Sequence, residues 1–216
     1  FEINGSITGI DNDLVKLIAD KSGCKLSFHK RPWARSLKEI AKGHMDFTAA
    51  ASITEERKKY AHYSISYRNE TMILLVKKGV SIKHPLKSLE EIADTHIILG
   101  VTRGVYYGEG FEAAIKNRDF ESKLHYTPGY YKNFRKLLSG HIHGVLGDKM
   151  SLMYTAKKDG VLDKVEIHPL PINDDKVYLM FSKKSVSPDI VEKINDSITQ
   201  LKSKGELDKI INKYIQ

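Results

Sequence analysis

The chain has 216 residues, of which 41% are hydrophobic and 29% are charged, and its formal net charge is +8 at pH 7. This composition is typical of a globular protein with one large domain or two smaller lobes, and no apolar run approaches the roughly 18 residues of a membrane span. The lysines are spread over many segments, without zinc-finger spacing, an RNA-binding aromatic motif or a basic tail, so the positive charge alone does not indicate nucleic-acid binding. The single cysteine, Cys24, excludes an internal disulfide and a cysteine metal cluster.

In the first third of the chain, helix and strand patterns alternate. Apolar residues recur at helical spacing in two segments that each end at a glycine, and short apolar runs separate them. Thr54 is a suitable N-cap for a further helix, because its hydroxyl can accept a hydrogen bond from the backbone of the first turn. The predicted elements are helices over 11–23 and 33–43, strands over 25–29, 45–52 and 70–78, and a helix that begins after Thr54.

The same alternation continues to the end of the sequence. Ser88 and Glu91 form a capping-box pattern, and Ser187 followed by Pro188 marks the start of a long helix. The segment 102–110 is punctuated by glycines and is predicted to be a loop. The remaining predicted elements are strands over 96–101, 141–148 and 176–184, and helices from about Phe111, over 131–140, from Pro188 and over 206–216.

Strand–helix alternation predicts an α/β architecture with mostly parallel sheets. Residues 37–47 and 134–144 share a helix, a terminating glycine, a histidine and a strand, and this weak repeat suits two similar lobes. Two long apolar strands, 71–78 and 176–184, fall between the halves of the pattern and are the natural crossings from one lobe to the other. The predicted division is a discontinuous lobe I, 1–70 plus 175–216, and a lobe II, 71–174.

The sequence offers little catalytic or metal-binding chemistry. It contains no nucleophile elbow, zinc-protease helix, P-loop or dinucleotide-binding glycine motif. His141 and His143 alternate on a predicted strand, but two histidines alone lack the further ligands that a metal site needs. Asp174 and Asp175 stand in a polar segment, where turn formation explains them better than acid–base chemistry. We therefore expect neither a cofactor nor a metal site.

Binding chemistry is better represented, because three residues stand at the strand ends and helix starts where two-lobed α/β proteins place their ligands. Arg57 lies in the first turn of the helix capped by Thr54, and a guanidinium suits a carboxylate, which it can grip with two hydrogen bonds. Asp148 ends a predicted strand and suits an ammonium group. Trp33 begins a helix and offers an apolar or cation-stacking wall.

Each of these residues also has an ordinary structural explanation, which the sequence leaves open. Arg57 is equally typical of a surface arginine that pairs with a neighbouring glutamate. Asp148 is a suitable helix N-cap, and Trp33 is a suitable core residue. Four tyrosines beside glycines are predicted to pack half-exposed in loops: Tyr106, Tyr107, Tyr130 and Tyr131.

Along nearly its whole length, the chain resembles the extracytoplasmic solute-binding proteins of family 3, the polar amino-acid receptors of bacterial ABC transporters. Residues 5–23 look like the opening G-x-x-x-G-x-D-x-D-L helix of that family. Residues 37–67 are similar to its most specific motif, L-x-x-G-x-x-D followed by T-x-x-R and F-S-x-x-Y. Segments 138–148 and 201–214 look like its second-lobe strand and its C-terminal signature.

This resemblance implies a two-lobed, type II periplasmic-binding fold that closes on its ligand by hinge motion. It implies that Arg57 grips the α-carboxylate of the ligand, that Asp148 takes its α-ammonium group, that Trp33 packs on its side chain and that Ser52 hydrogen-bonds its amino group. It also implies a monomer in the periplasm, or lipid-anchored outside the cytoplasm, which serves a membrane ABC permease. The other implied ligand-binding positions are Ala50, Gly104, Val105 and Tyr106.

The chain departs from the family pattern at several of these positions. Ala49 and Ala50 replace small polar residues, so their hydroxyls are lost. The segment 104–106, Gly-Val-Tyr, replaces the usual Gly-Ser/Thr-Thr, and His143 stands where an aspartate is common. The resemblance further implies a first strand upstream of Phe1, which this sequence does not include.

Two other functions are compatible with the same fold. One is the extracytoplasmic ligand-sensing domain of a signalling receptor. The other is a dehydratase acting on a cyclic carboxylate, which needs a general acid in the cleft. The candidate acids are Glu70, Glu109 and Asp148, and none has a distinctive sequence context.

Overall fold

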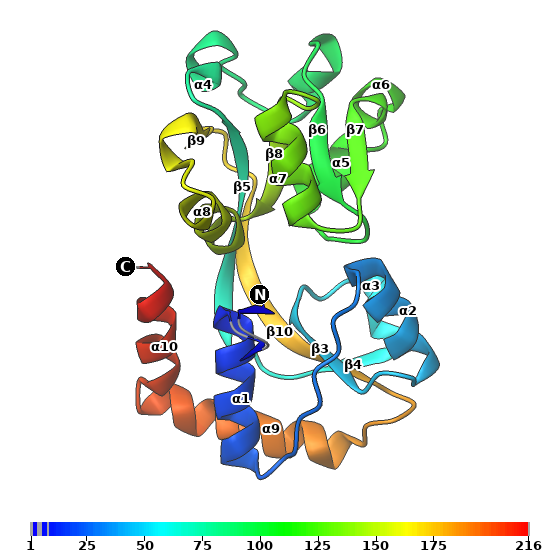
Figure 1. Ribbon diagram of the computed structural model, residues 1–216. Coiled ribbons are helices and arrows are strands. Elements are labelled where there is room, and N and C mark those ends of the chain that lie inside the picture. The colour runs from blue at the N-terminus through cyan, green and yellow to red at the C-terminus, as the bar shows by residue number, and fades with distance from the viewer. Residues whose placement is uncertain (1, 4–5, 8, 216) are drawn as a thin grey trace. The chain divides into compact units, whose positions relative to one another are not determined.

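The computed structural model (Figure 1) describes residues 2–3, 6–7 and 9–215, and the chain divides into two units. Unit 1 contains the chain up to Arg31, Arg35–Asn69 and the chain from Asp175 onward, and unit 2 contains Pro32–Ala34 and Glu70–Asp174. Two strands carry the chain from one unit to the other, namely β5 (Arg68–Lys77) and β10 (Asn173–Ser182). The sheet is flanked by helices, which confirms the predicted α/β class.

Unit 1 is built from antiparallel strand pairs and helices. Strands β3 (Phe47–Ala51) and β4 (Ala61–Tyr63) both pair antiparallel with β10, which enters this unit from the other one and runs against them. The prediction of mostly parallel sheets therefore does not describe these pairs. The other elements are β1 (Glu2–Ile3), β2 (Ser6–Ile7), α1 (Ile10–Ser22), α2 (Trp33–Lys42), α3 (Glu55–Lys58), α9 (Pro188–Ser203) and α10 (Glu206–Ile215).

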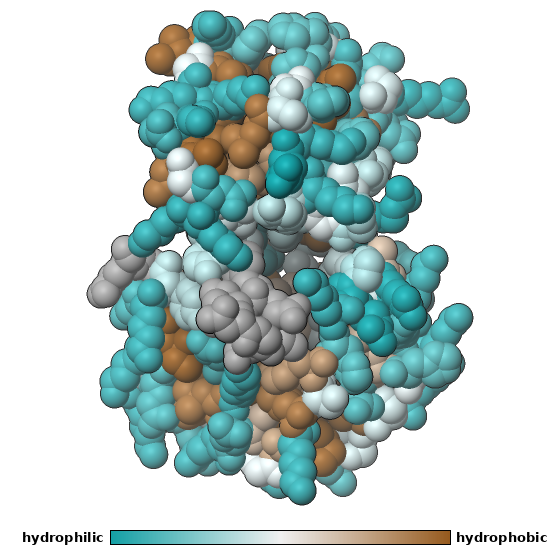
Figure 2. All heavy atoms as spheres, in the orientation of Figure 1, coloured by the Kyte–Doolittle hydropathy of each residue, from teal (hydrophilic) through white to brown (hydrophobic). Residues whose placement is uncertain are grey.

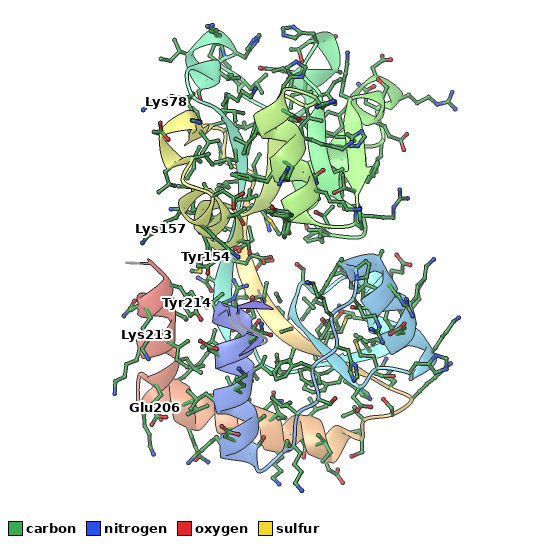
Figure 3. All side chains as sticks on the ribbon, viewed as in Figure 1. Lys78, Tyr154, Lys157, Glu206, Lys213 and Tyr214 are labelled. Carbon is green, nitrogen blue, oxygen red and sulfur yellow. The ribbon has the colours of Figure 1, made fainter. Side chains whose placement is uncertain are left out.

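The helices of unit 1 follow their sequence patterns. Helix α1 buries Leu14 and Ile18 and packs against α9, whose Ile198 is fully buried. Burial of each such side chain contributes roughly 1.5–3 kcal/mol to the free energy of folding. Gly23 ends α1 at φ 65°, in the left-handed region that glycine adopts without strain. Helix α10 also packs on α1, and Tyr214 donates a hydrogen bond to Asp13 at 2.6 Å (Figure 3).

Unit 2 is a mixed sheet with both faces covered by helices. Strand β6 (Leu99–Thr102) pairs parallel with β7 (Leu124–Thr127) and with β8 (Gly144–Asp148), whereas β5 pairs antiparallel with β8 and with β9 (Val165–Ile167). The helical segments are α4 (Val80–Lys83), η1 (Glu90–Asp94), α5 (Glu109–Ala114), α6 (Arg118–Ser122), α7 (Tyr130–Ser139), α8 (Lys149–Lys158) and η2 (Leu162–Lys164).

Strand β5 shows why its sequence is a continuous apolar run. Met72 and Leu74 pack into one core, with Phe111 of α5, while Ile73 and Leu75 pack into a second core, with Phe134 of α7. Because successive side chains point to opposite faces, a strand buried on both faces has no polar alternation.

Two local predictions were wrong, one of them because a strand depends on a distant partner. Residues 25–29 show the alternating burial of a strand, but they form no strand, since a strand also needs a paired neighbour. The Ser88–Glu91 capping box does not form: Glu91 accepts a hydrogen bond from the Lys87 amide at 3.0 Å, and the segment is a 3-10 helix beginning at Glu90.

Three further expectations for polar and aromatic residues were also wrong. Asp174 and Asp175 do not form a turn, because they belong to the first residues of β10. His141 and His143 precede β8 and do not alternate on it. Tyr107 is not half-exposed, since only 1% of its surface is accessible.

The surface of each unit agrees with the spread of lysines in the sequence. Hydrophilic residues cover most of the visible face of each unit (Figure 2). Lys78 follows β5, Lys157 lies in α8 and Lys213 lies in α10, and all three are exposed and point outward (Figure 3). Among the residues that the structure describes, no helix has the length and apolar character needed to cross a membrane.

Three histidines of unit 2 stack edge to face. The ring centroids of His84 and His96 lie 5.1 Å apart, and those of His96 and His143 lie 5.4 Å apart. The Ile98 amide donates to Nδ1 of His143 at 3.0 Å. Burial lowers the pKa of His143, and the nearby His96, His84 and Lys77 lower it further. Over the described ranges, no three His, Cys, Asp or Glu side chains are arranged to hold a metal ion.

The lowered pKa of His143 predicts a pH-dependent stability. The folded state binds a proton less readily than the unfolded chain, so this contribution to stability is present above the ordinary pKa of 6.5 and is lost as the pH falls through the folded pKa. We expect the urea midpoint to decrease from about pH 7.5 to about pH 5.5. Glu166 does not contribute in this window, because hydrogen bonds from Ser81 hold its pKa at about 2.

A His143→Asn variant tests this assignment, because the asparagine oxygen can still accept from the Ile98 amide but does not titrate. Its urea midpoint should change less with pH than that of the wild type. His29→Asn is the control, since His29 is exposed and lies in unit 1. An unchanged pH dependence in His143→Asn would contradict the assignment.

Candidate functional site

The predicted ligand-binding residues occur in both units, and each set is described separately. Those in unit 1 are Ala50, Ser52 and Arg57, and those in unit 2 are Trp33, Gly104, Val105, Tyr106 and Asp148.

Arg57 is a buried residue of unit 1, with only 6% of its surface accessible. Its Nη1 donates to the Ser52 carbonyl at 2.9 Å, and its backbone amide donates to the Thr54 hydroxyl at 3.3 Å, as predicted for the N-cap. Glu55 pairs with Lys58 at 2.6 Å. The interpretation of Arg57 as a surface arginine is therefore wrong.

The short helix around Arg57 changes how an anion would be held there. Helix α3 has only four residues, so its dipole is a minor source of attraction. The guanidinium is the buried cationic group of this helix, whereas Lys58 is exposed. A buried cation is costly unless acceptors or an anion compensate it, and a carboxylate matches its planar fork of donors.

Ser52 and Ala50 lie at the end of β3, just before Arg57. Ser52 is 9% accessible and uses its carbonyl to hold Arg57. Ala50 has a φ of 53° and donates its amide to the hydroxyl of Tyr67 at 2.9 Å. The backbone here leaves the regular geometry of a strand immediately before the arginine.

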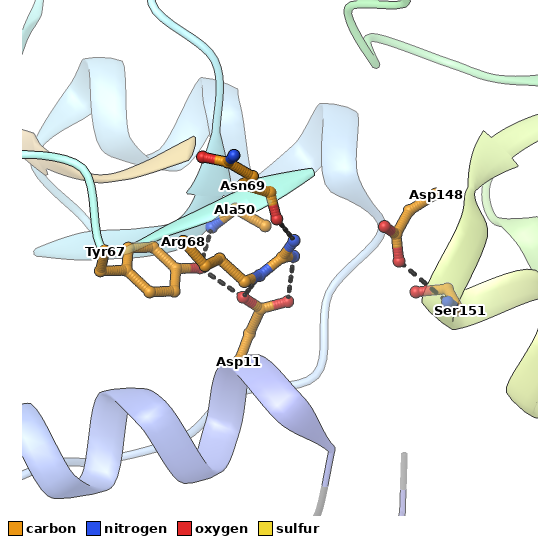
Figure 4. A network of polar contacts seen from close by, with 7 residues as sticks. All are labelled: Asp11, Ala50, Tyr67, Arg68, Asn69, Asp148 and Ser151. Atoms are coloured by element: carbon orange, nitrogen blue, oxygen red, sulfur yellow. Dashed lines mark hydrogen bonds and ion pairs between the residues drawn. The ribbon is translucent and has the colours of Figure 1, made fainter. Parts of the chain in front are cut away.

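Asp148 ends β8 and is the N-cap of α8, where its Oδ2 accepts from the Ser151 amide at 2.8 Å (Figure 4). The N-cap interpretation is therefore confirmed. Asp148 is only 3% accessible, and its Oδ1 is buried without a hydrogen-bond partner in the described part of the chain. Buried polar atoms are nearly always hydrogen-bonded, so this oxygen is suited to a donor from outside the chain.

Two tyrosines lie near the ends of β6 and β8, of which Tyr107 is buried and Tyr130 is partly buried. The ring of Tyr130 lies against Gly147, where an added Cβ would be 2.9 Å from ring carbons. Burial raises the pKa of Tyr130 well above its usual value, and the neighbouring Tyr107, Glu70 and Asp148 add to that shift. The Tyr107 hydroxyl accepts from the Thr102 amide at 2.7 Å. Tyr107 and Tyr130 were not among the predicted site residues, because no local pattern marks them as neighbours of Asp148.

The loop after β6 contains the other predicted residues of unit 2. Trp33 is half-buried, and its indole Nε1 donates to the Gly104 carbonyl at 2.8 Å. It is therefore not one of the fully buried core side chains. Val105 packs partly against the core of unit 2, and Tyr106 is half-buried. Gly104 has a φ of 79°, which glycine adopts readily.

Comparison with known proteins identifies relatives along nearly the whole chain. Over 220 aligned residues the chain is 30% identical to the ABC transporter glutamine-binding protein GlnH of Bacillus subtilis (strain 168), covering 99% of this chain and 74% of the relative. A solved ancestral arginine-binding protein bound to arginine is 27% identical, with a TM-score of 0.84 and coverage of 100% and 92%. A solved ancestral amino acid-binding protein, AncCDT-1, described as a precursor of cyclohexadienyl dehydratase, is 25% identical, with a TM-score of 0.79 and coverage of 100% and 89%.

The family match extends over the full sequence and confirms the resemblance seen in the motifs. Residues 1–216 match the family described as bacterial extracellular solute-binding proteins, family 3. The relatives compared above are named as binding proteins. The chain belongs to the bacterial extracellular solute-binding proteins of family 3.

Proposed function

We propose that this protein is an extracytoplasmic receptor that binds a small amino acid, or a related zwitterion, and delivers it to a membrane ABC permease. The observation that carries the proposal is the buried Oδ1 of Asp148, which has no hydrogen-bond partner among the described residues. An ionised carboxylate oxygen is costly to bury without a donor. The α-ammonium group of an amino acid supplies both the hydrogen bond and the opposite charge.

The second group of the proposed site is Arg57, which receives the α-carboxylate. Its guanidinium is buried, and one of its nitrogens is fixed by the Ser52 carbonyl, so its orientation is set before ligand arrives. Such preorganisation lowers the entropy that binding has to overcome. We assign the Ser52 hydroxyl to the ligand amino group, as the family resemblance implies.

The remaining positions are assigned to the side-chain end and the backbone of the ligand. We propose that Trp33 packs on the ligand side chain, since its indole is half-buried and held by the Gly104 carbonyl. Ala50, Val105 and Tyr106 are proposed to contribute through their backbone or through shape. Val105 fits this assignment because its side chain packs toward the core of its own unit.

We further propose that the two units act as closing lobes, with residues 1–70 and 175–216 in one and 71–174 in the other. Strands β5 and β10, which carry the chain between the units, are the proposed hinge. Ligand binding would then shift the balance from open to closed states by its higher affinity for the closed one. The proposed working form is a monomer in the periplasm or anchored by lipid outside the cytoplasm.

We propose binding without catalysis. The relatives that support the function are named as transport binding proteins, and AncCDT-1 is itself described as amino acid-binding. Of the candidate acids, Glu109 is exposed and Asp148 uses one oxygen to cap α8. These placements do not favour Glu109 or Asp148 as a general acid.

Isothermal titration calorimetry of ligand-free protein against the twenty amino acids tests the function. We expect one or a few of them to bind with a Kd of about 1 μM or tighter, near −8 kcal/mol. The desamino analogue of the best ligand should bind far more weakly, because it cannot engage Asp148. Absence of heat for every amino acid, from protein shown to be folded and ligand-free, would reject the proposal.

A further inference from the structure

A hydrogen-bond network in unit 1 contacts β3 at Ala50 (Figure 4). The Tyr67 hydroxyl donates to Oδ1 of Asp11 and accepts from the Ala50 amide, at 2.9 Å. Arg68 holds the same carboxylate with two bonds, from Nε at 2.7 Å and from Nη2 at 2.8 Å. Tyr67 and Arg68 are 1% and 5% accessible, whereas the Asp11 side chain is 27% accessible, so only the tyrosine and the arginine are shielded from water. Charge-assisted hydrogen bonds of this kind are shorter and stronger than neutral ones.

Ala50 is the point where this network meets a distorted strand. Its φ of 53° makes it the one residue other than glycine with a positive φ in the described ranges. Alanine is strained there, because its Cβ crowds the backbone, and such a conformation persists only where the surroundings enforce it. The strain at Ala50 therefore needs a specific restraint.

The strand register explains what the strained residue does. Tyr178 of β10 faces Ala51, but Met180, two residues later, faces Thr48, three residues earlier on β3. One extra residue is therefore inserted in β3, which forms a β-bulge at Ala49 and Ala50. A bulge frees a backbone amide from the ladder and redirects the residues that follow. The freed amide of Ala50 donates its hydrogen bond to the Tyr67 hydroxyl.

The redirected residues are those that hold the candidate carboxylate group. Ser52 comes two residues after Ala50, and its carbonyl accepts from Nη1 of Arg57 at 2.9 Å. The direction of that carbonyl depends on the path of the backbone through the bulge. A continuous chain of contacts thus runs from Asp11 and Tyr67 through Ala50 to Ser52 and Arg57.

We propose that Tyr67, anchored by Asp11 and Arg68, is a positioning residue that locks the bulge at Ala50 and so orients Ser52 and Arg57 toward the ligand. The last step of this inference rests on the proposed function, whereas the lock itself does not. Burial raises the pKa of Tyr67 well above its usual value, and the Asp11 charge raises it further, so the phenol stays protonated. It therefore donates to Asp11 and keeps a lone pair for the Ala50 amide.

The test compares Tyr67→Phe in the wild-type background and in an Ala50→Gly background. Without the hydroxyl, the Ala50 amide loses its acceptor and alanine relaxes from the left-handed region. We expect Tyr67→Phe to weaken ligand affinity about tenfold or more. Glycine adopts positive φ without strain, so in the Ala50→Gly background the same change should cost less than about threefold.

Tyr214→Phe is the matched control, because it removes another tyrosine hydroxyl that donates to a carboxylate of α1, that of Asp13, at 2.6 Å. Its affinity should stay close to that of the wild type. Asp11→Asn is a second test of the same inference and replaces Tyr67→Phe if that variant does not fold. It weakens the anchor of Tyr67 while keeping an oxygen acceptor, so we expect a smaller loss that Ala50→Gly also rescues.

A measurement without ligand separates the lock from the proposed function. The Cα and Cβ chemical shifts of residue 50 report its backbone conformation, and they should leave the left-handed range in Tyr67→Phe. If wild-type protein binds no amino acid, the proposed function fails while these shifts still test the lock. The inference is overturned if the shifts do not change, or if Tyr67→Phe loses equal affinity in both backgrounds.

Discussion

An Arg57→Ala variant is expected to bind the amino-acid ligand roughly 30-fold to several thousand-fold more weakly than the wild type, a loss of about 2–5 kcal/mol. The size follows from burial: Arg57 is 6% accessible, so a carboxylate paired with it is shielded from water. Removing the guanidinium leaves that carboxylate desolvated without its partner, and much of the loss comes from this effect.

Stability has to be measured beside affinity, because the variant also loses the bond from Arg57 to the Ser52 carbonyl. The loss of affinity is attributed to the missing ligand contact only if urea unfolding shows that the variant is folded. The affinity of Arg57→Lys for the ligand should lie between those of the wild type and Arg57→Ala, since lysine keeps the charge but not the planar fork of donors.

Arg35→Ala is the matched control for Arg57→Ala. The Arg35 side chain is 63% accessible and pairs with Glu39 at 2.6 Å on the surface of α2. Exposed pairs of this kind contribute about 0–1 kcal/mol, so affinity and stability should both stay near the wild type. A folded Arg57→Ala variant that retains wild-type affinity would remove Arg57 from the site.

Features set by neighbouring residues were predictable from the sequence. The Thr54 cap, the glycine after α1 and the proline at the start of α9 all depend on contacts within a few residues, and the structure has each of them. The helical stripes and the apolar strand β5 were predictable for the same reason, because periodicity reports the face that is buried.

Features that need a distant partner were not predictable in this way. The pairing of β10 against β3 and β4 depends on where the chain returns to unit 1. Residues 25–29 have a suitable pattern but pair with no strand in the described part of the chain. The bond between Tyr67 and Asp11 joins residues 56 positions apart, so no local signal links them. The bulge at Ala50 likewise becomes visible only when the register with β10 is known.

The candidate site shows how two explanations of one residue can both hold. For Asp148, the sequence offered a helix cap and a ligand-binding carboxylate as alternatives. In the structure Oδ2 accepts the capping hydrogen bond from the Ser151 amide, and Oδ1 has no hydrogen-bond partner among the described residues. A carboxylate has two oxygens, and sequence patterns do not say how they are divided.

This division makes Asp148→Asn a sharp test of the ammonium site. The asparagine oxygen can still accept from the Ser151 amide, and asparagine caps helices about as well as aspartate, so the urea midpoint should not fall. Its amide group then presents donors where the ligand ammonium needs an acceptor, and the negative charge is gone. We expect affinity for the amino acid to fall by about 2–5 kcal/mol.

The desamino analogue of the ligand is the control for Asp148→Asn, because it has no ammonium group to lose. Its weak affinity should be unchanged or improved, since the variant no longer buries an uncompensated carboxylate oxygen. Asp148→Ala differs by also losing the cap, which should lower stability by about 1 kcal/mol. An equal loss of affinity for the amino acid and its desamino analogue in Asp148→Asn would show that Asp148 acts through the fold of unit 2 and not through the ammonium group.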